Sequence, residues 1–407
     1  MSVFSELNKI VSTEKDDVVS GHEFQKLLQI FFLGSLVGLP TLSSILRKFN
    51  VTSNDSQVKY KKICKNLSSN KIRLIFEYIF EQEVLSKLSK MSKKDISCWS
   101  KELVTVVLDD SIFRQWIQNT DRLTDPYYGS FFSGQFGTTV YGYKVVTLAL
   151  SIDGVLYPLY FDFVKKKEAE SYEKATEVAQ KLVNRFGVLA KKSRDNGLSI
   201  PALHFSCDNG YNDPKLAKIC LDNNLIFISV PKKTEKIEVD NKVQKMSNWI
   251  NEAFMLLEEE HQKKEENLPD SDKTAFTHRF RAKYQSRNEV VTFLAFRLNG
   301  SKKVSVIYSY DKNIFAKTMR RHWFQRTHIE QFFKLLKHVL QIKEARVTNK
   351  IDFEIKLNRF AFIALHAQKL VRFVRKKVDE FKNKGFISIQ RILNSDPEIL
   401  DLLQRIL

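Results

Sequence analysis

The sequence predicts a mixed α/β protein with helical regions at both ends. Between residues 103 and 230, short apolar runs rich in β-branched residues alternate with helical stretches, which is typical of a mixed sheet covered by helices. Residues 1–100 and the chain after Ala316 instead carry the spacing of helices. A length of 407 residues favours two or three domains.

The first hundred residues are expected to form helices, one of which has a basic face. A turn at residues 51–54 precedes a helix from Asp55 that carries Lys59, Lys61 and Lys62. A helix, a tight turn and a basic helix resemble a helix-turn-helix DNA module, although a small bundle with a solvated lysine face has the same pattern. We expect residues 1–100 to be a helical DNA-binding domain in which these lysines contact DNA.

The central region is expected to contain the sheet. Strands are predicted at 103–108, 143–152, 155–164, 201–207 and 225–230, and helices at 169–192 and 214–221. Asp153 and Gly154 separate the second and third strands and predict a tight hairpin.

Residues 231–312 interrupt this alternation. A charged helix is expected at 242–265 and an exposed loop at 262–273, followed by strands at 276–284, 289–298 and 303–310, which together make a β-rich insertion. The chain is then helical and basic, with 18 Lys or Arg against 6 Asp or Glu between Lys317 and Lys384. The C-terminal region 351–407 is therefore either a surface for a nucleic-acid backbone or a solvated helix face.

Charge and composition narrow the function classes. The net charge of +19 favours a polyanionic partner, chiefly nucleic acid, over a merely basic protein without one. The longest apolar run, residues 30–39, is shorter than the ~20 residues of a membrane span, and no basic-then-apolar leader opens the chain. We therefore expect a cytoplasmic protein without a membrane partner. The four cysteines form no CxxC pair, and no phosphate-binding loop occurs, which argues against zinc sites, a disulfide framework and NTP hydrolysis.

Two carboxylates follow predicted buried strands. Asp109 follows the strand at 103–108, and Asp208 follows the strand at 201–207. Strand ends of an α/β sheet present ligand groups rigidly, although aspartate is also a common turn residue.

A third acid lies on a predicted helix among cations. Trp323, Arg326, Glu330 and Lys337 fall within an arc of about 60° on such a helix. Lys334 lies on a neighbouring stripe. A solvated Arg326–Glu330 pair, worth only ~0.3 kcal/mol, would have the same spacing.

Together these residues resemble the DDE transposases of insertion sequences, whose signature is Tyr-x2-Arg-x3-Glu-x6-Lys. This chain has Trp323-x2-Arg326-x3-Glu330-x6-Lys337. The family's first acid ends an apolar strand, as in VTVVLDDS here, and its second follows a strand, as in LHFSCDNGYN. The resemblance covers roughly residues 101–350 and includes the family's β-rich insertion between the second and third acids. Two departures, Trp323 for tyrosine and Ser111 for threonine, remove no acid.

The resemblance implies an RNase H-like catalytic domain at 101–350. It also implies that Asp109 bridges two Mg²⁺ ions, that Asp208 and Glu330 each hold one, and that Mn²⁺ substitutes. Arg326, Lys337 and the less favoured Lys334 would hold DNA phosphates, and Trp323 would stack on a base or sugar.

The function that the resemblance implies is cut-and-paste transposition. The protein would bind the terminal inverted repeats and the target as double-stranded DNA, act as a dimer on DNA and associate with the bacterial nucleoid. A hairpin intermediate at the excised end is a further extrapolation from the family. The alternatives are an inactive transposase-derived DNA-binding protein and an RNase H-like nuclease without strand transfer.

Overall fold

The computed structural model describes residues 69–91, 103–114, 124–134, 137–198, 200–265, 276–297, 304–342, 347 and 349–377. The predicted helix-turn-helix and its residues Lys59, Lys61 and Lys62 lie outside these ranges. In the described part of the chain, no helix has both the length and the apolar character to cross a membrane.

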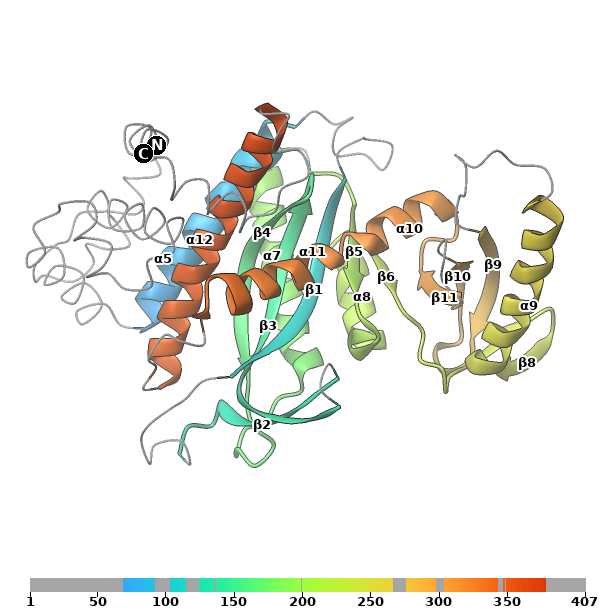
Figure 1. Ribbon diagram of the computed structural model, residues 1–407, viewed down its shortest axis with the longest axis horizontal. Helices are drawn as coiled ribbons and strands as arrows, with labels where there is room; N and C mark the ends of the chain where they lie inside the picture. Colours follow the sequence, from blue (N-terminus) through green and yellow to red (C-terminus); the bar gives the residue numbers. More distant parts are fainter. Residues whose placement is uncertain are drawn as a thin grey trace, which may run out of the picture.

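A large mixed sheet organises the molecule (Figure 1). Its first six strands are β1 (Val104–Phe113), β2 (Tyr128–Ser133), β3 (Thr138–Ile152), β4 (Val155–Val164), β5 (Leu203–Cys207) and β6 (Leu225–Ser229). The order through the core is β4-β3-β1-β5-β6; β1 pairs antiparallel with β3 and parallel with β5, and β5 pairs parallel with β6. This arrangement confirms the mixed α/β sheet predicted from the sequence and is consistent with the RNase H-like fold that the family resemblance implies.

Two features of these strands bear on the predictions. The hairpin at Asp153 and Gly154 is present, and both residues have the positive φ that its tight turn requires, 52° and 76°. β1, in contrast, does not end at Leu108 as expected, because its pairing with β3 continues to Phe113. Its parallel pairing with β5 does stop at Leu108, so Asp109 lies where the sheet opens on one side only.

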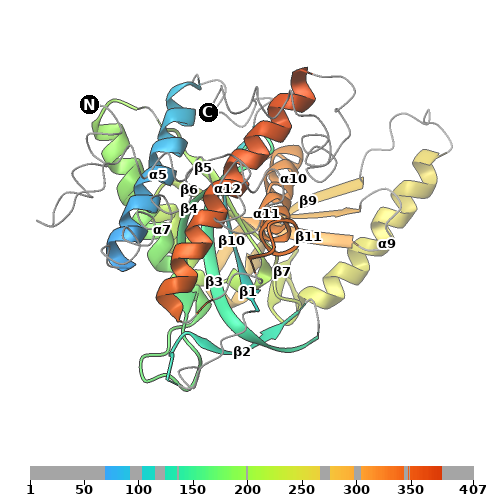
Figure 2. The ribbon, with the colours of Figure 1, turned by 60° about the vertical axis from the view of Figure 1, so that its left-hand side comes forward.

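Helices cover both faces of the sheet (Figures 1 and 2). One layer contains α7 (Ala175–Asp195) and α8 (Pro214–Asp222), and the other contains α10 (Ala316–Phe324), α11 (Thr327–Lys334), the π-helical turn η5 (Leu335–Val339) and α12 (Lys350–Lys377). α7 begins six residues later than predicted, because the Glu177 carboxylate accepts a hydrogen bond from the backbone N–H of Lys174 and caps the helix there.

The helix α5 (Ser69–Ser89) belongs to the predicted N-terminal helical region, yet it packs on the core beside α12 and β4. Its Glu77 carboxylate forms a two-pronged ion pair with Arg185 of α7, at 2.9 and 2.6 Å. Its Glu81 carboxylate accepts a 2.6 Å hydrogen bond from the Tyr160 hydroxyl of β4. The described parts of the two terminal regions are therefore continuous with the sheet core.

The segment between β6 and α10 adds five strands and a helix. These are β7 (Lys236–Val239), β8 (Lys242–Lys245), α9 (Met246–Glu265), β9 (Phe276–Tyr284), β10 (Glu289–Arg297) and β11 (Val304–Ser309). β11 joins them to the core by pairing with β6. The helix expected from Lys242 starts at Met246 instead, because Asp240 and Asn241 adopt left-handed conformations and turn β7 into β8.

A cluster of aromatic rings joins α12 to the sheet. Phe353 is fully buried, with its ring centroid 4.8 Å from Tyr143 and 5.6 Å from Phe113. We expect Phe353→Ala to lower the free energy of unfolding by about 3–5 kcal/mol, because the cavity that it leaves is enclosed by rigid rings. Urea unfolding followed by fluorescence measures this loss. The neighbouring Ile351→Ala, at an exposed position, should change it little, and an equal effect of both variants would contradict the packing argument.

Candidate active site

Adjacent parallel strands place the first two acids side by side. The register pairs Thr105 with His204 and Leu108 with Cys207, so Asp109 and Asp208 follow at matching positions. Asp208 is the first residue after β5, and its backbone carbonyl accepts a hydrogen bond from the Ser229 hydroxyl of β6. Both side chains are half-buried. The Asp208 carboxylate is close enough to contribute to the raised pKa of Asp109.

The α10–α11 segment runs along one face of β1 (Figure 1). Contacts recur at every fourth residue of the strand: Thr105 Oγ1 is 2.7 Å from His322 Nδ1, Asp109 contacts Arg326, and Phe113 packs edge-on against Phe333. Since alternate residues of a strand share one face, Asp109 points toward this helical segment.

His322 is an anchor for that segment rather than a ligand. Its ring stacks on His204 of β5 with centroids 3.7 Å apart, and both rings are buried. Burial lowers the pKa of His322 to about 2 and that of His204 to about 4, so both are neutral at physiological pH. This environment suits a packing role for His322.

The predicted helix is broken where the signature begins. α10 ends at Phe324, and the backbone N–H groups of Gln325 and Arg326 donate to carbonyls three residues back. The Ser151 hydroxyl of β3 donates a 2.9 Å hydrogen bond to the Gln325 side chain at this point. A tightened turn therefore separates α10 from α11, and Arg326 lies in it.

Arg326 joins two of the three predicted acids. Its Nη1 lies 2.7 Å from Glu330 Oε1 and 3.4 Å from Asp109 Oδ2. The Arg326 and Asp109 side chains are 15% and 17% exposed, whereas Glu330 is 40% exposed, so the bridge runs from the protein interior to its surface. Arg326 thus lies between Asp109 and Glu330, and Asp208 follows the neighbouring parallel strand.

Asp109 is held in an environment that disfavours its charge. Burial and the neighbouring Asp110, with a smaller contribution from Asp208, raise its pKa to about 7 despite the opposing effect of Arg326. The cluster is therefore short of positive charge.

Asp110 lies on the opposite face of β1 from Asp109 and contacts residues that support the site. Its carboxylate accepts a 2.7 Å hydrogen bond from the Tyr211 hydroxyl and pairs with Lys144 at 3.0 Å. Tyr211 ends the short turn that Asp208 caps, so the contact ties the loop of the second acid to the strand of the first. Tyr211 was not among the predicted site residues; its position as an aromatic residue three places after Asp208 is the signal that points to a role.

The remaining predicted residues differ in their surroundings. Lys337, in η5, is half-buried over the Phe113 ring at 5.2 Å, and burial lowers its pKa to about 8 against the opposing effect of Asp110. Lys334 is exposed at the end of α11. Trp323 is half-buried and packs edge-on against Phe296 of β10, with its indole N–H enclosed and unpaired.

Asp109, Asp208 and Glu330 are not arranged to coordinate a metal ion as they stand. Within the described ranges, no three His, Cys, Asp or Glu side chains are grouped so that they could hold an ion as they stand. The reason is visible at Arg326, whose guanidinium pairs with both Asp109 and Glu330. The donors are carboxylate oxygens, the ligands that Mg²⁺ prefers, so the set fits the ion in chemistry but requires Arg326 to move.

The raised pKa of Asp109 predicts a pH-dependent stability in chelator. In the folded state Asp109 keeps its proton up to about pH 7, whereas in the unfolded state it releases the proton near pH 4. Ionising Asp109 in the folded protein therefore lowers the free energy of unfolding, progressively from pH 4 to 7 and by a constant amount above pH 7. We expect Asp109→Asn to raise the free energy of unfolding above pH 7, by about 4 kcal/mol at most, and to change it little near pH 4.

Thermal or urea unfolding at pH 5 and pH 8 measures the difference. Asp222→Asn, at an exposed position of α8, is the matched control and should leave the free energy of unfolding unchanged at both pH values. A gain for Asp109→Asn that is equal at both pH values, or a loss at pH 8, would contradict the argument.

Two kinds of solved structure are similar to this chain. A piggyBac transposase synaptic complex with hairpin DNA aligns with a TM-score of 0.43 and 10% identity, over 96% of this chain and 75% of that one. Endonuclease V of Ciona intestinalis, in complex with an inosine-containing DNA, aligns with a TM-score of 0.28 and 13% identity, over 59% of this chain and 85% of that one. No family model and no curated protein matches the chain. These scores are too low to transfer a function, which has to be argued from the residues of the site.

Proposed function

We propose that the chain is a DNA transposase of the DDE type that cuts and rejoins phosphodiester bonds at the ends of an insertion sequence. The observation that carries the proposal is the placement of Asp109, Asp208 and Glu330. They lie on two adjacent parallel strands and one crossing helix, in the order and spacing of the family signature, and Arg326 pairs with both Asp109 and Glu330. The pairing of the first and third acids through one arginine, next to the strand of the second acid, supports the proposal over a chance match of spacing.

Asp109, Asp208 and Glu330 would hold two divalent ions, Mg²⁺ or Mn²⁺, with Asp109 between them. Bound there, the ions would activate the attacking oxygen and stabilise the leaving oxygen of an in-line displacement. The raised pKa of Asp109 supports this assignment, because a buried carboxylate among other acids needs added positive charge to ionise fully.

The cations of the signature would act on DNA. Arg326 would exchange its carboxylate partners for a phosphate of the bound strand, since a guanidinium can contact two oxygens at once. Lys337 would contact a phosphate from the η5 turn, with Lys334 further out on the exposed face. Trp323 would reach a base or sugar only by leaving its contact with Phe296.

The larger assembly follows from the reaction. Joining two ends in one event requires two active sites, so we propose a dimer on DNA that grips the terminal inverted repeats and then the target. The N-terminal region with Lys59, Lys61 and Lys62 would read or hold the repeats. The net charge of +19 supports a nucleic-acid partner of this kind.

A cleavage assay tests the chemistry. The substrate is a labelled duplex that spans one end of the element encoding the chain, together with its flank. We expect wild type to nick it at the boundary with Mg²⁺ and not with chelator, and Glu330→Gln to be slower by at least about 10³-fold, because one ion loses its carboxylate.

Glu173→Gln is the matched control, because Glu173 is a half-buried carboxylate that pairs with Lys181 away from the site, and this variant should cleave like wild type. Adding a target plasmid separates the two active functions, since a transposase yields joined products and a nuclease only nicks. Specific binding without metal-dependent cleavage by wild type would identify an inactive DNA-binding descendant instead.

Metal binding to Arg326→Gln tests the displacement of the arginine. Removing the guanidinium frees Asp109 and Glu330 from their ion pairs, so we expect Mn²⁺ to bind about tenfold more tightly without DNA, whereas DNA cleavage falls because the phosphate contact is lost. Calorimetry or electron paramagnetic resonance measures the first effect. Arg279→Gln, which changes an exposed arginine of β9, is the control. Unchanged or weaker Mn²⁺ binding by Arg326→Gln would contradict the proposal that the metal displaces Arg326 from the two acids.

A further inference from the structure

The β2–β3 hairpin extends beyond the sheet core at the end where the acids lie. β1 ends at Phe113, opposite Tyr143, whereas β3 begins five residues earlier, at Thr138, and pairs there with β2. Figure 1 shows this hairpin at the lower end of the molecule, past the end of β1.

One face of the hairpin is open and aromatic. Phe132 and Tyr141 are 66% and 67% exposed, which is unusual for rings in paired strands. The register pairs Phe132 with Thr139 and Ser130 with Tyr141, so the two rings are diagonal neighbours on one face, and Ser130 and Thr139 are exposed between them.

The exposed face of the β2–β3 hairpin lies on the same side of the sheet as the Asp109 side chain. Asp109 pairs with Thr147 of β3, and alternation along β3 brings Val145, Tyr143 and Tyr141 to the same side. The Tyr143 ring stacks on Phe353 of α12, in the layer that contains Arg326 and Glu330. Tyr141 is six residues from Thr147, or about 20 Å along the strand.

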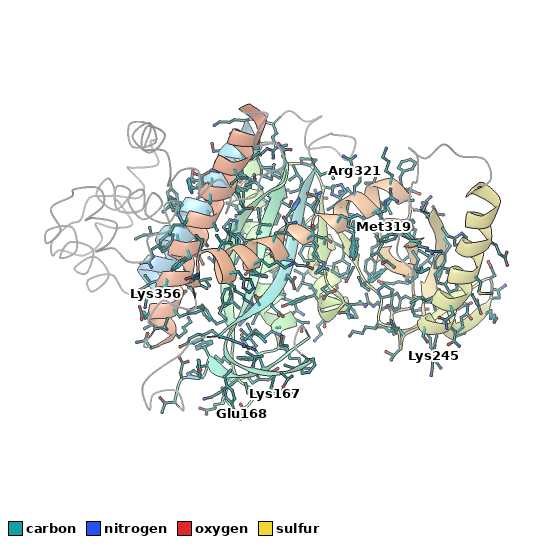
Figure 3. The ribbon with its side chains drawn as sticks, in the orientation of Figure 1. Lys167, Glu168, Lys245, Met319, Arg321 and Lys356 are labelled. Atoms are coloured by element: carbon teal, nitrogen blue, oxygen red, sulfur yellow. The ribbon has the colours of Figure 1, made fainter. Side chains whose placement is uncertain are left out.

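The reverse face of the hairpin is closed by a basic loop. The backbone N–H of Lys166 donates a 2.8 Å hydrogen bond to the Pro126 carbonyl just before β2. A Cβ added at Gly129 would lie 2.7 Å from the Lys166 Cβ, which shows how closely the loop approaches β2. Lys165 and Lys167 flank this contact, and Lys167 is exposed at the lower end of the molecule (Figure 3).

We propose that Phe132 and Tyr141 form a stacking surface for the bases of a single-stranded stretch of nucleic acid that leads away from the three acids. The flat rings match the faces of unpaired bases, and the net charge of +19 favours a polyanionic strand as the partner. In a duplex the base faces are covered by their neighbours, so the surface selects unpaired DNA. The inference rests on the proposed function, because a strand leading from the acids presupposes a nucleic-acid substrate.

Binding by the full chain with Glu330→Gln, in chelator, tests the proposal without cleavage. The probes are a blunt duplex and the same duplex with an unpaired tail of about 12 nucleotides, within the site sizes typical of stacking grooves. We expect tighter binding of the tailed duplex, and Phe132→Ala and Tyr141→Ala each to weaken it by about tenfold. Affinity for the blunt duplex should not change.

Conservative variants separate ring stacking from a general apolar contact. Phe132→Trp and Tyr141→Trp should keep the preference for the tail, whereas Phe132→Leu and Tyr141→Leu should lose it despite their apolar area. Tyr172→Ala, at an exposed aromatic outside the hairpin, is the matched control. A 2-aminopurine base moved along the tail should change its fluorescence at the stacked positions only when both rings are present.

Three results would overturn the proposal. The double alanine variant could bind the tailed duplex as tightly as its parent, or the leucine variants could do so. Alternatively, sedimentation could show that the alanine variants lose self-association while affinity for the tail is unchanged, which would make the face an interface between copies of the chain. Failure of Mg²⁺-dependent cleavage in wild type would contradict the proposed function alone, since this binding is measured without metal.

Discussion

The parallel pairing of β1 with β5 is the constraint on which the candidate site depends. It ends at Leu108 and Cys207, so the next residue of each strand is an aspartate released from the ladder beside its neighbour. The antiparallel pairing of β1 with β3 continues past this point and keeps Asp109 on a rigid strand. The Asp110–Tyr211 contact holds the loop of Asp208 from the opposite face. Two chain segments about a hundred residues apart are thus held in one arrangement by backbone hydrogen bonds.

The placement of these carboxylates is electrostatically unfavourable. Burial, the like charge of Asp110 and, to a smaller degree, that of Asp208 raise the pKa of Asp109 to about 7. Arg326 offsets part of this repulsion by pairing with Asp109 and Glu330. One guanidinium serves two carboxylates, and Asp208 has no ion pair with any residue that the structure describes, so the cluster stays receptive to further positive charge.

Much of the core could be predicted from the sequence, because its strands are short apolar runs bounded by turn residues. The Asp153–Gly154 hairpin and the strands β4, β5, β6 and β9 fall within two residues of their expected limits. The end of β1 could not be predicted, since Asp109 and Asp110 resemble a turn and only the partner strand β3 keeps them extended. The break between α10 and α11 at Gln325 could not be predicted from the neighbouring sequence either, because Gln325 bonds there to Ser151 of the distant strand β3.

The same distinction applies to the site. The assignment of Asp109, Asp208 and Glu330 rests on a spacing that matches a known signature, and it stays a prediction. Tyr211 and the His204–His322 stack carry no such signal, although they set the positions of Asp208 and of the Arg326 turn. A sequence pattern identifies residues that do chemistry, whereas residues that only hold them in place are chosen by the shape of the fold. It follows that the precision of the three acids depends on buried neutral contacts, and that changes there would disturb the site without touching any acid.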